Sequence, residues 1–195
     1  MDIEKLTLEL HYMQQAYATL FSVVNKIQTR GDEVMEEITS RQQMALIAIV
    51  HLPQEETTLI NIATMLATTK QTANKLITGL KNKGYIETIP SKKDKRSINV
   101  IITETGKNVL IKSSEKTTYF LADIFNEFTS EEVELFWHML QKLYCFDGEE
   151  QNGFEERASF GIDKESDNNE VQLKNKIMEE FSKRRKKHVL EGNNK

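Results

Sequence analysis

The sequence predicts a mainly α-helical protein with one small two-stranded β-hairpin, an α+β fold. Three observations support this class. The two prolines, Pro53 and Pro90, both stand at the ends of regular segments, so few breaks interrupt the helices. Apolar residues recur at i, i+3, i+4 and i+7 in several stretches, the spacing of one buried helical face. The period changes near residues 85–102, where two short β-type segments flank a lysine-rich tip.

The composition indicates one globular domain with an appendage. The chain has 195 residues, of which 38% are hydrophobic and 29% charged. No apolar run approaches the ~20 residues that a membrane-spanning helix needs, and the amino end shows no signal-peptide pattern. Cys145 has no second cysteine to pair with, which is typical of a reducing compartment. We therefore expect a cytoplasmic protein without membrane contact.

A long first helix is predicted over residues 6–29. Its apolar positions follow alternating steps of four and three, the seam of three heptads. The seam either packs inside one subunit or forms a dimer contact. Gly31 and the acidic run after it are expected to mark a bend or break. The seam residues are Leu6, Leu10, Met13, Tyr17, Leu20, Val24 and Ile27.

Two further helices precede the basic segment. Thr39 and Gln42 have the form of a capping box, which begins a helix that is apolar on nearly all sides over residues 44–52. A shorter helix follows, with a buried stripe expected at Leu59, Ile62, Ala63 and Leu66. The dipeptide at 67–68 is a tight turn into the next helix.

The helix over residues 69–82 has two opposed faces. Thr69 is its expected N-cap and Gly84 its C-terminal left-handed residue. Residues 69–96 contain eight basic and two acidic side chains, a net charge of +6 in a chain whose formal net charge is −4. A compact basic segment on an acidic protein is typical of a nucleic-acid contact. The buried stripe is predicted at Ala73, Leu76, Ile77 and Leu80.

From Leu59 to Gly106 the chain resembles the winged helix-turn-helix of the MarR family of bacterial transcription regulators. The residues that carry the resemblance are INIATMLATTKQTANKLITGLKNKGYIETIPSKKDKRSINVIITETG. They match in order the first helix, tight turn, recognition helix, Gly-aromatic-Ile strand, Asp-x-Arg wing and closing Thr-Glu-x-Gly. A looser likeness covers residues 6–146. The resemblance implies a mainly α fold with a small two-stranded β-wing and a homodimer that binds double-stranded DNA.

The outward face of the recognition helix carries the expected base contacts. Gln71 and Asn74 can pair with adenine, Lys75 can reach guanine, and Thr72 and Thr78 suit phosphates or a thymine methyl. Phosphate contacts are expected from Lys70, Lys81, Lys92, Lys93 and Lys95, beside the cap Thr69. By resemblance to the family, Arg96 enters the minor groove and Asp94 holds its guanidinium.

The resemblance, together with the change of charge along the tail, implies a division of the chain into five parts. They are an N-terminal dimerisation helix and link (1–38), the winged helix-turn-helix region (39–102), C-terminal dimerisation helices (103–146), an acidic linker (147–170) and a basic tail with a short helix (171–195). The basic tail is open to three interpretations: an extra phosphate contact, docking onto the acidic linker or a partner, or a free solvated end. The expected dimer contacts are Leu6, Leu10, Met13, Tyr17, Leu20, Phe136, Leu140 and Tyr144.

Regulation and competing functions are less well defined by the sequence. The family resemblance implies a small-molecule effector of unknown identity that binds in a crevice. Tyr12, Tyr17 and Met44 could line this crevice, but packing in the core explains these residues equally well. No cofactor and no metal are expected, because the histidines lack ligand spacing. Cys145 is expected to be structural. No glycine-rich phosphate loop, GxSxG or HExxH is present, so no enzyme is predicted. The alternative is a dimeric adaptor whose basic segment docks an acidic protein partner.

Overall fold

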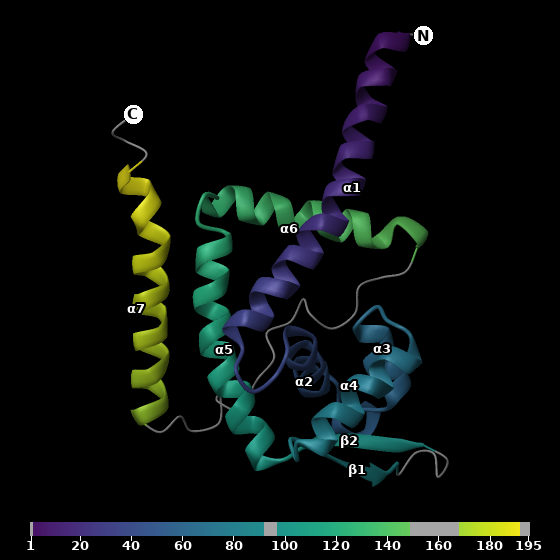
Figure 1. The fold of residues 1–195 in the computed structure, drawn as a ribbon, viewed down its shortest axis with the longest axis vertical. Helices are drawn as coiled ribbons and strands as arrows, with labels where there is room; N and C mark the ends of the chain where they lie inside the picture. Colours follow the sequence, from purple (N-terminus) through teal and green to yellow (C-terminus); the bar gives the residue numbers. More distant parts are fainter. Residues whose placement is uncertain (1, 92–96, 149–167, 192–195) are drawn as a thin grey trace.

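The computed structural model describes residues 2–91, 97–148 and 168–191, with side chains of the last segment described for 171–185. Its elements run in the order shown in Figure 1. They are α1 (Ile3–Val34), α2 (Ser40–His51), η1 (Gln54–Glu56), α3 (Leu59–Met65), α4 (Lys70–Asn82), β1 (Ile86–Pro90), β2 (Ile98–Ile102), α5 (Glu104–Ile124), α6 (Ser130–Tyr144), η2 (Cys145–Asp147) and α7 (Asn168–Glu191). The predicted mainly α class with one small hairpin is confirmed.

The hydrophobic core lies among α2, α3, α4, the hairpin and the first turns of α5. α2 contributes most to it, as its apolar composition predicts, and crosses the middle of this half. The predicted stripes of α3 and α4 face this core, with Ile62 and Leu80 fully buried. The largest completely buried side chains are Leu46, Ile62, Leu80, Ile86 and Val100.

The hairpin pairs β1 and β2 antiparallel, with Ile86 opposite Ile102. Pro90 is the last residue of β1, opposite Ile98, rather than a residue outside the strand. Side chains alternate between faces in a strand; here Ile86 and Val100 are buried. The hairpin therefore closes the lower side of the core in Figure 1.

The first helix is not a core helix of its own subunit. Among the residues of α1 only Gly31 is buried, and Figure 1 shows the helix extending away from the body. Gly31 does not break α1, which continues to Val34; a Cβ at this position would lie 2.4 Å from Ser40 Oγ. The close approach of the Ser40 hydroxyl at the start of α2 therefore favours glycine at this position.

α6 likewise buries nothing within one chain. It begins at a capping box formed by Thr129 and Glu132, but none of its residues is buried. Aromatic side chains gather at the corner between α5 and α6, where the ring centroids of Phe125 and Phe128 are 5.7 Å apart. α6 therefore leaves its apolar side chains at least partly exposed in the single chain, whereas α5 buries Val109, Leu110 and Ala122.

The basic tail forms a helix of 24 residues, longer than the short helix expected. It lies alongside α5, as Figure 1 shows, so the described part of the tail docks within its own chain. Most of the acidic segment, residues 149–167, falls outside the described residues.

Within the described segments, no helix combines the length and apolarity needed to cross a membrane. The same segments contain no cluster of three or more histidine, cysteine, aspartate or glutamate side chains arranged for a metal ion. Cys145 is exposed at the end of α6, so burial does not support the structural role expected of it.

Candidate nucleic-acid interface

The helix-turn-helix is built from α3, a four-residue connection (66–69) and α4. Thr58 caps α3 by accepting the N–H of Asn61, and Thr69 caps α4 by accepting the N–H of Thr72. Ala67 lies between them with a positive φ of 45°. This left-handed residue, which the sequence analysis did not predict, lets Thr68 N–H bond back to Ala63 O at 2.9 Å and ends α3 sharply.

The outward face of α4 carries the predicted contact residues in a single exposed row. The stripe of Ala73, Ile77 and Leu80 is buried against the core and fixes the rotation of the helix. Because the face repeats every three to four residues, the opposite positions all face solvent together. The exposed ones are Thr69, Lys70, Gln71, Asn74, Lys75, Thr78, Lys81 and Asn82.

Three polar residues of this region have partners that restrict what they can contact. Thr72 is half-buried, and its hydroxyl lies 3.0 Å from Thr69 Oγ1, so it supports the cap. Lys81 Nζ donates to Thr88 Oγ1 at 2.7 Å and ties α4 to β1. Lys83 Nζ donates to Glu37 O at 2.8 Å, which directs this cation toward the α1–α2 connection.

Gly79, in the middle of the recognition helix, is explained by its neighbour on α2. A Cβ at Gly79 would lie 2.9 Å from Gln42 Nε2. Gln42 closes the capping box of α2 through its Oε1, which accepts the N–H of Thr39. The same oxygen accepts from Lys83 Nζ at 3.3 Å. A helix propensity cost of ~1 kcal/mol for glycine is thus accompanied by close packing of α4 on α2.

The predicted wing residues Lys92, Lys93, Asp94, Lys95 and Arg96 lie outside the described residues. The described base of the hairpin is firmly held. Ser91 N–H donates to Ser97 O at 2.9 Å, across the point where the tip begins. Val100 N–H donates to Thr57 O at 3.0 Å, and Asn99 Nδ2 donates to Gln54 O at 3.1 Å. The tip therefore begins from strands anchored to η1 and to the residues before α3.

The hairpin is joined to α5 by a tight backbone contact. The hydroxyl of Thr103, the N-cap of α5, donates to Gly84 O at 2.8 Å and accepts the N–H of Gly106. A Cβ at Gly106 would lie 2.0 Å from Tyr85 O. Only glycine fits at this contact, which sets the angle between the hairpin and the long helix.

α2 is tied to α5 by a buried amide. Gln43 is 3% exposed, its Nε2 donates to Ser113 Oγ at 3.2 Å, and its Oε1 accepts from Thr117 Oγ1 at 2.8 Å. Ser113 in turn donates to Leu110 O. Both ends of the amide are satisfied, as a buried polar group requires. α2, which shares a core with α3 and α4, is thereby held against α5 at a defined position.

A cavity of about 490 Å³ lies between the α1–α2 connection and α5. Lys116 Nζ lies 2.8 Å from Glu36 Oε1, and this hydrogen bond, with the charge of the lysine, holds the pKa of Glu36 below its ordinary value. Tyr119 also lines the cavity. Neither Tyr12 nor Tyr17 does; they are 64% and 67% exposed on α1, so neither suggested role, crevice or core, holds within one chain.

Comparison with known proteins identifies similar chains. Residues 37–97 match the sequence model of the MarR family. The chain is 27% identical over 124 residues to the uncharacterized HTH-type transcriptional regulator YpoP of Bacillus subtilis, covering 64% of this chain and 87% of that protein. A MarR protein from Peptoclostridium difficile superposes with a TM-score of 0.56 at 26% identity over 68% of this chain and 84% of that one. The Staphylococcus aureus MepR–DNA complex gives 0.60 at 23% identity over 66% and 96%.

Proposed function

We propose that this chain, whose residues 37–97 match the MarR family model, is a transcriptional regulator that represses transcription by binding a pseudo-palindromic DNA site as a homodimer. The observation that carries the proposal is the exposed polar row of α4, Gln71 to Asn82, opposite its buried stripe. A helix of this kind fits the major groove of B-DNA. MepR, which shares this fold, was solved bound to DNA. The proposal includes a cytoplasmic location, where such a regulator meets the chromosome.

Gln71 and Asn74 are the proposed base readers. Both are exposed near the amino end of α4, the part of a recognition helix that contacts base edges. Each side-chain amide can donate and accept at once, the pattern that adenine N6 and N7 complement. Lys75 is proposed to reach guanine, and Lys70 a phosphate. The wing residues Lys92 to Arg96 are proposed to contact the neighbouring backbone and minor groove.

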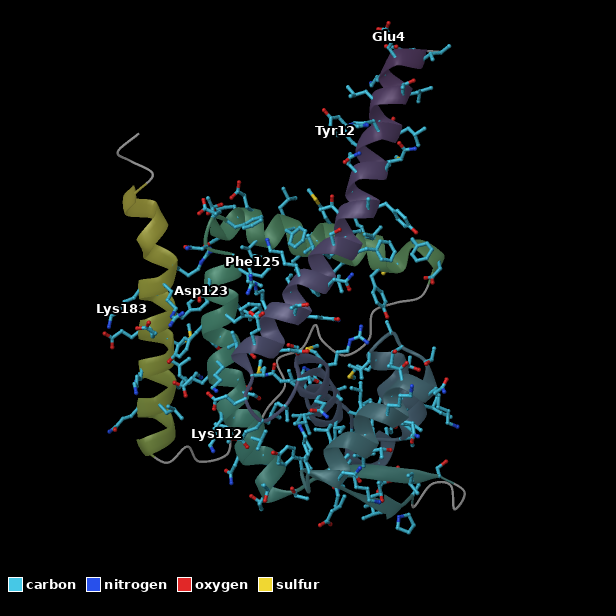
Figure 2. All side chains as sticks on the ribbon, viewed as in Figure 1. Glu4, Tyr12, Lys112, Asp123, Phe125 and Lys183 are labelled. Atoms are coloured by element: carbon cyan, nitrogen blue, oxygen red, sulfur yellow. The ribbon has the colours of Figure 1, made fainter. Side chains whose placement is uncertain are left out.

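The proposed dimer uses the apolar surfaces that one chain leaves uncovered. Leu10, Met13 and Tyr17 are 54%, 58% and 67% exposed along the projecting part of α1 (Figure 2). α6 adds Phe136, Leu140 and Tyr144, none of them buried. Uncovered apolar area of this extent is typical of an interface. Two-fold pairing would present two copies of α4 to successive major grooves, about 34–36 Å apart.

We further propose that a small aromatic anion regulates binding from the cavity beside α5. Lys112 and Lys116 stand at this cavity with Tyr119, and both lysines are paired with glutamates of the α1–α2 connection. An anion there would compete for the lysines and loosen the connection from α5. The connection joins the proposed dimer helix α1 to α2, so its position would affect the spacing of the two α4 helices in the dimer. A ligand would change DNA affinity only if it binds more tightly to one such spacing than to another.

The experiment begins with selection of bound duplexes from a random pool, followed by anisotropy titrations at fixed salt. Gln71→Ala and Asn74→Ala are expected to weaken the selected site by about five- to a hundredfold and to relax base preference. Lys70→Ala should weaken all sequences alike and lower the salt slope by about one. Lys183→Ala removes a cation from the outward side of α7 and is the control (Figure 2). Equal affinity for an inverted repeat and a scrambled duplex would refute the proposal and favour the adaptor.

A further inference from the structure

The C-terminal helix α7 has one face matched to α5. Half-buried side chains gather between residues 177 and 185, while Lys183 and Glu179 are exposed and paired with each other at 2.9 Å. In Figure 2 Lys183 points away from α5, whereas Asp123 lies between the two helices. The half-buried positions between 177 and 185 are Ile177, Glu180, Phe181, Ser182, Arg184 and Arg185.

Arg184 makes the lateral contact with α5. Its Nη1 lies 2.8 Å from Asp123 Oδ2, and its Nε lies 3.1 Å from Glu180 Oε1 on its own helix. The guanidinium carbon stands 4.9 Å from the centre of the Tyr119 ring, a cation–π distance. Asp123 and Tyr119 are four residues apart and so share one face of α5. One arginine thus engages two successive turns of that helix.

Arg185 makes the end contact. Its guanidinium donates to Phe125 O and, at 2.6 Å, to Phe128 O. These carbonyls lie where α5 has ended and the chain turns into α6. Phe125, the C-cap of α5, also accepts the N–H of Phe128 at 3.1 Å. Arg185 therefore adds a second, charged donor to the turn that follows α5.

The docking of α7 nevertheless has the character of a reversible contact. No residue from 171 to 185 is buried, and residues 171–176 are all exposed. Asp123 is 55% exposed in its ion pair with Arg184. Exposed charge pairs are screened by salt, and regions with few buried apolar contacts open locally at low free energy.

Tyr119 connects this contact to the cavity. Its ring lies beneath Arg184 on one side and lines the cavity between α5 and the α1–α2 connection. Partial burial raises the pKa of Tyr119, as does the hydrogen bond from its hydroxyl to Glu115 Oε1 at 3.0 Å. Glu115 lines the same cavity. If α7 left α5, one face of the Tyr119 ring, which lines the cavity, would be uncovered.

We propose that α7 is a detachable strap, held on α5 by Arg184 and Arg185, whose docking orders the Tyr119 wall of the cavity. When the strap opens, Tyr119 loses its guanidinium cover, and the stretch of α5 from 115 to 123 becomes more mobile. Any ligand that fills the cavity against Tyr119 must then bind the docked and open forms differently, and the coupling is reciprocal. The docking itself involves neither DNA nor effector.

The test is hydrogen exchange of backbone amides in the full chain. In the parent, amides 177–185 are expected to be protected, and 1 M KCl should speed their exchange. Arg184→Ala and Arg185→Ala should each speed it about tenfold to a hundredfold, the loss of a charge-assisted bond. Asp123→Asn, which keeps the side-chain shape, should act in the same direction as Arg184→Ala. Lys183→Ala, one residue away, should change nothing.

The coupling has its own readout. In Arg184→Ala, amides 115–123 should also exchange faster, while those of α2 keep parental rates and show that the core is folded. Parental exchange of 177–185 at free-peptide rates, or equal rates in Arg184→Ala and Lys183→Ala, would overturn the strap. Unchanged 115–123 amides with an open α7 would overturn the coupling. Each result is independent of whether the protein binds DNA.

Discussion

Replacement of Gly106 by alanine tests how the hairpin is joined to α5. The added Cβ would lie 2.0 Å from Tyr85 O and 2.8 Å from the Cγ2 of Ile102. A carbon and a carbonyl oxygen normally approach to about 3.3 Å. The first contact is with backbone, which cannot rotate away, so the hairpin and α5 must separate by more than about 1 Å.

The magnitude follows from two contributions. Overpacking costs about 1–3 kcal/mol and occasionally more. The displacement also strains the bond from Thr103 N–H to Tyr85 O at 3.1 Å, whose loss adds ~1 kcal/mol. A net destabilisation of about 3 kcal/mol corresponds to a fall in Tm of roughly 6–12 °C for a chain of this size.

The assay is urea and thermal unfolding followed by circular dichroism. Gly79→Ala is the matched control, because its Cβ would meet only the movable end of Gln42 at 2.9 Å. Alanine gains ~1 kcal/mol of helix propensity there, so its stability should stay within about 1 kcal/mol of the parent. If Gly106→Ala unfolds with the parental midpoint, or if the two variants are equally destabilised, the steric reasoning is wrong.

Three further predictions concern the other contacts. Gln43→Leu should lower the free energy of unfolding by about 1–3 kcal/mol in urea titrations, since the two hydroxyls on α5 lose their amide; parental stability would contradict this. Tyr17→Asp should weaken self-association in sedimentation equilibrium, because a charge enters the proposed α1 interface; an unchanged mass would count against that interface. Lys116→Ala should raise the pKa of Glu36 toward its ordinary value in an NMR titration. A carboxyl group whose pKa is lowered in the folded state stabilises the protein at pH values above the usual carboxyl range. This stabilisation is lost as the pH falls through the lowered pKa. Lys116→Ala should therefore make the free energy of unfolding depend less steeply on pH in the acid range.

Local chemistry was predictable from the sequence wherever a few neighbouring residues decide it. The N-caps at Thr39 and Thr69 form as expected, because each depends on a hydroxyl and an amide three residues later. The outward row of α4 follows in the same way from helical period. The wing residues proposed to contact DNA are a prediction that the described residues do not test.

Long-range contacts were not predictable, for a physical reason. Gly31 is equally consistent in sequence with a helix break and with close approach, and only the position of Ser40 decides for the second. The hydrogen bonds from Arg185 to two backbone carbonyls give no recognisable signal in the sequence, because a residue of any type could supply a carbonyl. The exposure of Tyr12 likewise depends on the direction in which α1 leaves the body.

The undivided course of α5 has a mechanical consequence. Its 21 residues span about 30 Å at the usual rise per residue. One end is fastened to the hairpin through Thr103, and the other turns into α6. A stiff rod of this length works as a lever: rotating one end by ~5° sweeps the other through roughly 2–3 Å. Small rearrangements at the corner between α5 and α6 can therefore shift the base of the hairpin by a comparable distance.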